Sequence, residues 1–190
     1  MFGFFLLTLV ASAAASKAGC PTNVVATENF DFKTFGTGIW FEAARYKNKM
    51  EKNGNCGYAE YTPKGDGMGV KNYDVAFGKK RLIEGSAKLA ADAGKTGKMI
   101  FSYPYGAGGA ITENTLYVLY NDDQSAVLFH CEENEDKTSR QDYAWVFSRS
   151  KTLKATSRAA IDKFLNENDF VDGGKLIWND FSEEACKVKA

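Results

Sequence analysis

Along most of this 190-residue chain, apolar and polar residues alternate with the period of two that is typical of β-strands. These runs are separated by short clusters of glycine, proline, asparagine and aspartate, which favour turns. We therefore predict eight strands, over residues 38–46, 56–62, 67–77, 81–89, 98–105, 115–120, 126–132 and 142–149. Eight strands joined by short connections are what an up-and-down antiparallel barrel requires.

One helical pattern follows the eight strands. Ile161, Phe164 and Leu165 fall on one face of this helix, and residues 166–169 end it. Thr156 or Ser157 is expected to cap its N-terminus. A ninth short strand is predicted over residues 175–178. The fold class is therefore all-β: an eight-stranded antiparallel up-and-down barrel with one C-terminal outer α-helix.

The first residues read as a targeting segment. Residues 2–10 are apolar and are followed by small residues that suit signal peptidase, so we expect cleavage near residues 15–18. We assign residues 1–16 to a signal peptide and residues 17–190 to a single domain. The apolar run is too short for a stable membrane anchor, and no later stretch is apolar enough to cross a membrane. The sequence predicts a secreted protein.

Composition narrows the classes of partner. Lysine plus arginine and aspartate plus glutamate both total 24, so no basic field for nucleic acid is present. In an exported chain the four cysteines predict two disulfides, and their spacing does not suit a zinc ribbon. Three pairings are possible, and the spacing alone does not choose among them. The oligomeric state is equally open, and a homo-oligomer is compatible with the sequence.

Gly38 and Trp40 begin the first predicted strand, and Arg149 closes the eighth. An inward tryptophan plugs one end of a small barrel, and an arginine from the last strand can lay its guanidinium over the indole. Strict alternation places Trp40, Glu42, Ala44 and Tyr46 inward, and Phe41 and Ala43 outward. It groups Gln141, Tyr143, Trp145 and Phe147 with Arg149, and leaves Ala144 and Val146 for the helix to cover.

Several segments carry a family resemblance. Residues 29–32, 56–63, 83–85, 146–151 and 179–186, together with the Gly-x-Trp and arginine positions, resemble the insect bilin-binding proteins and insecticyanins, lipocalins of the apolipoprotein D-like branch. The segments occur in the family's order and span essentially the whole mature chain. In the second lipocalin signature, usually close to Thr-Asp-Tyr, this chain has Asn121-Asp122-Asp123, at a turn of the closed end.

The resemblance implies a function and a disulfide pattern. It implies a secreted pigment protein of a lepidopteran-type insect, in hemolymph or epidermis, that holds biliverdin noncovalently as the IXγ isomer. It also implies the pairs Cys20–Cys131 and Cys56–Cys186. Carried over position by position, the ligand-binding residues are Asn48, Lys49, Met50, Glu51, Asn72, Asp74, Ile83, Phe101, Tyr103, Tyr105, His130, Gln141, Tyr143 and Trp145.

Those side chains make chemical sense for an extended conjugated ligand. The aromatic residues can stack on it, and Asn72, Asp74 and Gln141 can form hydrogen bonds with pyrrole nitrogens or lactam oxygens. Lys49 and Lys52 can meet ligand carboxylates at the rim. The alternative without a ligand is that the same aromatic side chains only fill the barrel interior. Eight-stranded barrels can, however, hold one small ligand.

Catalysis is not expected. His130 is the only histidine, which leaves neither a histidine-rich metal site nor a Glu-His-His triad, and paired cysteines provide no thiol nucleophile. We predict no catalytic residues and no metal. Two other interpretations stay open: a lipocalin that carries a carotenoid, a retinoid or a fatty acid, and one whose outer surface acts on a partner protein.

Overall fold

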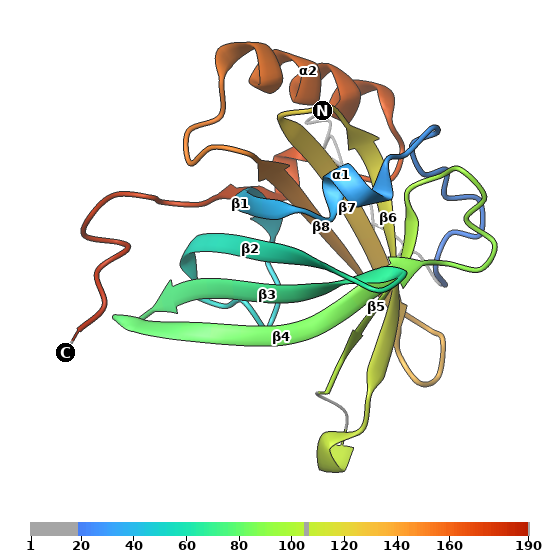
Figure 1. Cartoon of the computed structure of the whole chain (residues 1–190), viewed down its shortest axis with the longest axis horizontal. Coiled ribbons are helices and arrows are strands. Elements are labelled where there is room, and N and C mark those ends of the chain that lie inside the picture. The colour runs from blue at the N-terminus through green and yellow to red at the C-terminus, as the bar shows by residue number, and fades with distance from the viewer. Residues whose placement is uncertain (1–18, 105–106, 190) are drawn as a thin grey trace, which may run out of the picture.

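The computed structural model describes residues 19–104 and 107–189, so the predicted signal peptide and Tyr105 lie outside the described residues. Eight antiparallel strands form a closed barrel, in which β1 pairs with both β2 and β8 (Figure 1). The strands of the barrel are β1 (Gly38–Tyr46), β2 (Asn55–Lys64), β3 (Gly67–Ala76), β4 (Lys79–Leu89), β5 (Lys98–Tyr103), β6 (Thr112–Asn121), β7 (Ser125–Glu133) and β8 (Arg140–Ser148). A ninth strand, β9 (Leu176–Trp178), pairs with the end of β1.

The strands confirm the prediction from alternation, and β1 has the predicted bounds. The largest difference is at β6, which begins at Thr112 rather than at residue 115, and β5 ends at Tyr103 rather than at residue 105. Pro104 follows, and proline has no backbone N–H to donate to a ladder. Short 3-10 helices, η1 (Ala107–Gly109) and η2 (Gly173–Lys175), lie in the connections.

One end of the barrel is closed by a packed core. The short helix α1 (Phe32–Phe35) crosses this end, and the Trp40 indole donates a hydrogen bond of 2.9 Å to the carbonyl of Phe35. The guanidinium of Arg149 lies 3.7 Å from the centre of the Trp40 ring, which confirms the predicted stack. Arg149 also donates hydrogen bonds to the carbonyls of Thr34, Thr37 and Ile39.

The turn between β6 and β7 lies at the same end. Asp122 accepts hydrogen bonds from the backbone N–H groups of Gln124 and Ser125, at 2.7 and 2.6 Å, and from the Tyr120 hydroxyl at 2.6 Å. The backbone N–H of Arg149 in turn donates to the Gln124 carbonyl. The Asn-Asp-Asp sequence therefore builds a closed-end turn in the predicted place.

A second core lies outside the barrel, under helix α2 (Ala155–Glu167) (Figure 1). Ile161 of this helix packs with Phe129 of β7 and with Ala144 and Val146 of β8, as the outward apolar positions of β8 predicted. The predicted cap is wrong. The helix begins at Ala155, so Thr156 and Ser157 are inside its first turn, and the N-cap residue Lys154 makes no side-chain capping bond.

The predicted outward position of Ala43 in β1 is confirmed, but the positions predicted beyond Ala43 are wrong. The pairing of β1 with β8 shifts register between Glu42 and Ala44, and such a bulge reverses the alternation that follows it. Ala44 and Tyr46 therefore join the core under α2, and Arg45 turns inward to the Glu42 carboxyl group. Trp40 and Glu42, before the bulge, face inward as predicted.

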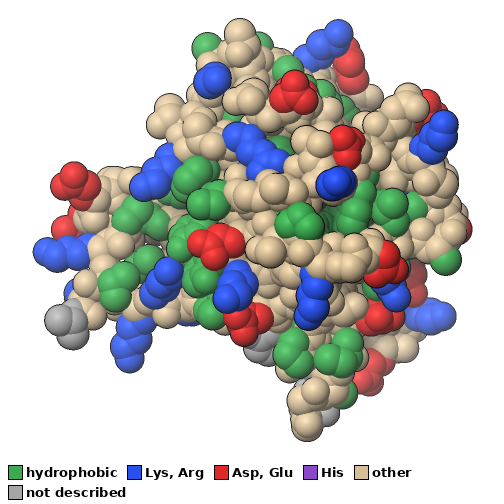
Figure 2. All heavy atoms as spheres, in the orientation of Figure 1, with side chains coloured by type: hydrophobic (Ala, Val, Ile, Leu, Met, Phe, Trp, Pro, Cys, Tyr) green, Lys and Arg blue, Asp and Glu red, His purple; other side chains and the backbone are tan. Residues whose placement is uncertain are grey.

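The two disulfides confirm the pairing that the resemblance implied. Cys20 is bonded to Cys131 with a Cα–Cα distance of 5.8 Å, and Cys56 to Cys186 with a distance of 5.5 Å. The second bond ties the C-terminal segment to β2, on the left in Figure 1. Figure 2 shows that lysine, arginine and acidic side chains are interspersed over the face of the molecule that is seen in Figure 1. In the described chain, no helix combines the length and apolar character needed to span a membrane.

Candidate ligand-binding cavity

The barrel is hollow at the end opposite Trp40. Three adjoining spaces of about 230, 120 and 110 Å³ lie between the strands and the β1–β2 loop. Glu51 of that loop and Asn72 of β3 line all three spaces. We treat them as one cavity, because a small ligand in any of them would touch the same two side chains.

Most of the residues that the resemblance placed in a pocket line this cavity. They are Asn48, Met50, Glu51, Asn72, Asp74, Ile83, Phe101, Tyr103, His130, Tyr143 and Trp145. Lys49 is exposed on the loop and does not line it. Gln141 is also exposed, and its amide donates a 2.9 Å hydrogen bond to the carbonyl of Asp142. Tyr105 lies outside the described residues.

The cavity also contains residues that were not predicted as part of the site. Glu42, Arg81, Asn114, Glu132 and Phe147 line it. Two of them carried a signal in the sequence, since Glu42 and Phe147 occupy inward positions of their strands. Arg81 could have been found from the hairpin, because pairing around the turn at residues 77–78 places it opposite Asp74.

One wall of the cavity is aromatic. The ring of Tyr143 stacks on that of Trp145 at 6.0 Å, with 13° between their planes, and on the His130 ring at 5.4 Å. Phe101 and Tyr103 stand side by side on β5, with ring centroids 5.5 Å apart. Flat rings on both β5 and β8 provide surfaces on which a conjugated ligand can stack.

His130 presents an acceptor to this cavity. Its Nδ1 lies 2.8 Å from the carbonyl oxygen of Thr115, so Nδ1 carries the proton and donates it. Burial lowers the pKa of the ring, which keeps it neutral, and the side chain is only 7% exposed. The remaining nitrogen, Nε2, is buried and has no hydrogen-bond partner among the described residues. A buried acceptor without a donor is costly, and a ligand N–H or O–H would satisfy it.

Asp74 already has a partner. Its carboxylate accepts hydrogen bonds from both Nε and Nη2 of Arg81, the first at 2.6 Å. The same guanidinium reaches the carbonyl of Lys52 in the β1–β2 loop at 3.4 Å. Asp74 therefore lines the cavity as half of an ion pair, and its charge is balanced before any ligand arrives.

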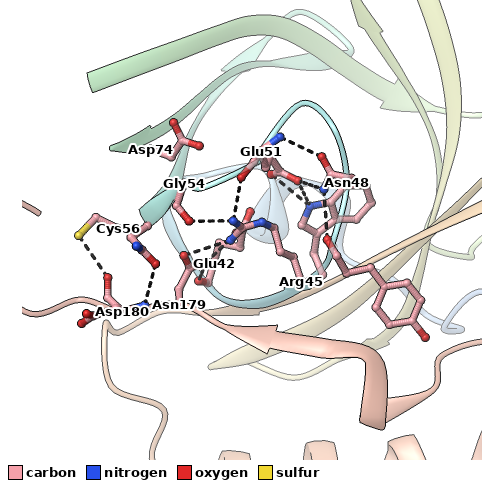
Figure 3. Close-up of polar contacts among 12 residues, drawn as sticks. Glu42, Arg45, Asn48, Glu51, Gly54, Cys56, Asp74, Asn179 and Asp180 are labelled. Carbon is pink, nitrogen blue, oxygen red and sulfur yellow. Dashed lines mark hydrogen bonds and ion pairs between the residues drawn. The ribbon is translucent and has the colours of Figure 1, made fainter. Parts of the chain in front are cut away.

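The β1–β2 loop is held against the barrel by a polar network (Figure 3). Arg45 donates hydrogen bonds to the carbonyls of Glu51 and Gly54, at 2.9 and 2.7 Å, and to the Glu42 carboxyl group at 2.9 Å. The Glu51 side chain points back into the barrel, where its oxygens accept from the Trp145 indole N–H at 3.2 and 3.3 Å. From the C-terminal segment, Asn179 donates to Glu42 at 2.6 Å.

The described residues contain no group of three or more potential metal ligands, and all four cysteines are in disulfides. The site combines an aromatic wall, a neutral acceptor and the ion pair of Asp74 with Arg81. A barrel that is packed at one end and hollow at the other, with such a lining, defines a binding protein for a small ligand.

The comparison with protein families identifies the class. The model described as "Lipocalin / cytosolic fatty-acid binding protein family" matches residues 37–175. The chain belongs to the lipocalin family. Lipocalins are binding and carrier proteins, and the resemblance seen in the sequence is confirmed.

Individual relatives agree with this assignment. The chain is 42% identical to the bilin-binding protein of Pieris brassicae over 96% of each sequence. It is 32% identical to insecticyanin-B of Manduca sexta, over 97% of this chain and 92% of the relative. The solved structure of insecticyanin from Manduca sexta matches with a TM-score of 0.81 and 31% identity, over 90% of both chains.

Proposed function

We propose that this lipocalin is a secreted carrier of biliverdin, bound noncovalently in the cavity. One observation carries the proposal: a stacked aromatic wall lies beside a buried histidine nitrogen that lacks a donor. A bilin is a flat conjugated chain of pyrrole rings with N–H donors along one edge, and it complements both features. The names of the two relatives, bilin-binding protein and insecticyanin, support the same ligand class.

Different side chains of the cavity provide different contacts to the ligand. Tyr143, Trp145 and Phe101 provide stacking surfaces, and His130 Nε2 accepts a hydrogen bond from a pyrrole or lactam N–H. Lys49 and Lys52 lie exposed on the β1–β2 loop, where propionate groups would emerge. Attachment is noncovalent because every cysteine is already bonded to another cysteine. The IXγ isomer is assigned from the resemblance.

We also propose that the protein acts outside the cell, in hemolymph or epidermis. Two disulfides suit an oxidising compartment, and the N-terminal segment has the composition of a secretory signal. The signal peptide covers residues 1–16, and residues 17–190 form one secreted domain. The proposed function is transport without catalysis, since the described residues contain neither a free thiol nor a metal-ligand cluster.

The test is a titration of the disulfide-intact protein with biliverdin. We expect one bilin per chain, a blue-green complex and quenching of tryptophan fluorescence, because Trp145 lines the cavity. The complex should release free biliverdin on denaturation. No spectral change and no quenching at tens of micromolar would overturn the proposal. Parallel titrations with a carotenoid, retinol and a fatty acid then identify another apolar ligand.

A further inference from the structure

The charges around the cavity do not balance, and the imbalance is located at Glu51. Elsewhere in the lining, Asp74 of β3 pairs with Arg81 of β4, whereas Glu132 has no partner among the described ion pairs. Glu132 of β7 lies at the exposed rim, where it accepts a 3.0 Å hydrogen bond from Tyr143. Burial raises the pKa of Tyr143 to about 12, so this phenol stays neutral.

The network behind Glu51 has two acids and one base. Glu42 and Arg45 form an ion pair at 2.9 Å, and Glu42 is only 8% exposed. The Glu51 carboxylate accepts hydrogen bonds from the neutral donors Asn48 and Trp145, and it has no ion-pair partner within 4 Å in the described chain. Burial, and then the neighbouring Glu51 carboxylate, raise the pKa of Glu42 well above its ordinary value. The two carboxyl groups therefore have only the one positive charge of Arg45 between them.

The Glu51 carboxylate occupies a central place in the cavity. It lines all three spaces. Figure 3 shows that it extends from the β1–β2 loop, between Asn48 and the network of Arg45. His130 lines two of the same spaces, and its buried Nε2 is an acceptor without a donor among the described residues. A ligand at this place meets two hydrogen-bond acceptors and one uncompensated negative charge.

We propose that Glu51 is the counter-ion of the bound ligand and that it holds a bilin in its protonated, cationic form, with the N–H edge facing Glu51 and His130. This inference rests on the proposed function. The proton comes from solvent and binds the one pyrrole nitrogen that lacks a hydrogen. The same excess charge repels a carboxylate at this depth, so Glu51 selects against fatty acids that enter with the acid group first.

The experiment follows the visible spectrum of the bound pigment with pH. Protonation moves the long-wavelength band of a bilin to longer wavelength, so the spectrum reports the charge of the ligand itself. Biliverdin dimethyl ester is titrated beside biliverdin, because the ester has no propionates that titrate at the rim. Each complex is scanned from about pH 5 to about pH 9, and the lowered pKa of His130 and the raised pKa of Tyr143 move the titration of these two side chains away from the middle of this window.

The variant is Glu51→Gln, which keeps the shape and an acceptor for Trp145 but removes the charge. An adjacent opposite charge favours the charged form of a base by roughly 1–3 pH units. We therefore expect the bound bilin to lose its proton at least about one pH unit lower in Glu51→Gln than in the unmodified protein. Glu51→Asp should recover part of the difference. Glu84→Gln is the matched control, since Glu84 pairs with Lys71 on the outer surface of the barrel and should change nothing.

The outcomes separate the two proposals. Biliverdin that binds both proteins with the same pH titration overturns the counter-ion and leaves the carrier function standing. Absence of binding at every pH overturns the carrier function and the counter-ion with it. Should Glu51→Gln fail to fold, the unmodified protein decides: its bound ester must stay protonated to higher pH than the same ester in neutral detergent micelles. A bound ester that is already neutral where the micellar ester is neutral contradicts the proposal.

Discussion

The two ends of the barrel use the same strands for opposite purposes. At the closed end, Trp40 is 1% exposed and packs with Phe35 and Phe147, and the Arg149 guanidinium that covers it donates to three carbonyls. At the open end, side chains of the same strands leave a cavity, an acceptor without a donor and an excess acid. Satisfied groups stabilise the fold, and unsatisfied groups are the ones that a ligand can use.

The comparison predicts that damage at the closed end affects stability. Trp40→Ala removes the largest fully buried side chain and leaves a void, so it should lower the free energy of unfolding by about 3–5 kcal/mol. Biliverdin affinity of the molecules that remain folded should be unchanged, because Trp40 does not line the cavity. Chemical denaturation and a bilin titration of the same sample measure both. Loss of affinity without loss of stability would show that the two ends are not separate.

Damage at the open end should have the opposite signature. Tyr143→Ala removes the ring that stacks on both His130 and Trp145, and it should weaken bilin binding by about 1–3 kcal/mol. The free energy of unfolding should fall by less, since the side chain is partly exposed at the cavity wall. A fluorescence titration checks the first quantity and the denaturation midpoint the second.

Arg149→Ala tests whether a charged residue at the closed end contributes to stability and not to ligand binding. The change removes the stack on Trp40 and three hydrogen bonds, so we expect a loss of about 1–2 kcal/mol in the free energy of unfolding. Bilin affinity should stay the same. If affinity falls and the midpoint of denaturation does not move, the role assigned to this arginine is wrong.

The open end should also give the protein a pH dependence of stability that comes from Glu42. Because the folded state raises the pKa of Glu42, its contribution to stability is present below about pH 4.5 and is lost as pH rises toward the folded-state pKa. Glu42→Gln abolishes this loss, so the unmodified protein should lose stability relative to the variant by at most about 1.4 kcal/mol per pH unit. Denaturation of both proteins over this range measures the difference. His130 contributes equally to both proteins and cancels in the comparison. A difference in the free energy of unfolding that does not change with pH would contradict the raised pKa of Glu42.

The smallest expected effect is that of a change at Gln141, at the boundary of the site. Gln141 is exposed and bonded only to its neighbour's carbonyl among the described contacts, so Gln141→Ala should change bilin affinity by less than about 0.5 kcal/mol. The family resemblance places it among the ligand-binding residues. A larger loss, measured by the same titration, would extend the cavity wall to this end of β8.

Sequence reasoning predicted the barrel well because alternation over eight strands is a repeated signal. It failed at β1 because nothing in Glu42-Ala43-Ala44 marks a bulge, neither glycine nor proline, and one extra residue reverses every position after it. Strict alternation does not place Arg45 with Glu42, and the network around Glu51 was therefore missed. The pairing of Asp74 with Arg81 needed only the register of the hairpin, which the sequence contained.

Helix α2 has a consequence for the motions of the barrel. It covers β7 and β8 from outside, so these strands are enclosed between two cores, and residues 125–130 are all buried. β4, in contrast, alternates along most of its length between exposed and partly buried positions. Amide hydrogens of β7 and β8 should therefore exchange with solvent last, and those of β3 and β4 earlier. We therefore expect the first local opening of the barrel at β3 and β4, on the side away from the helix.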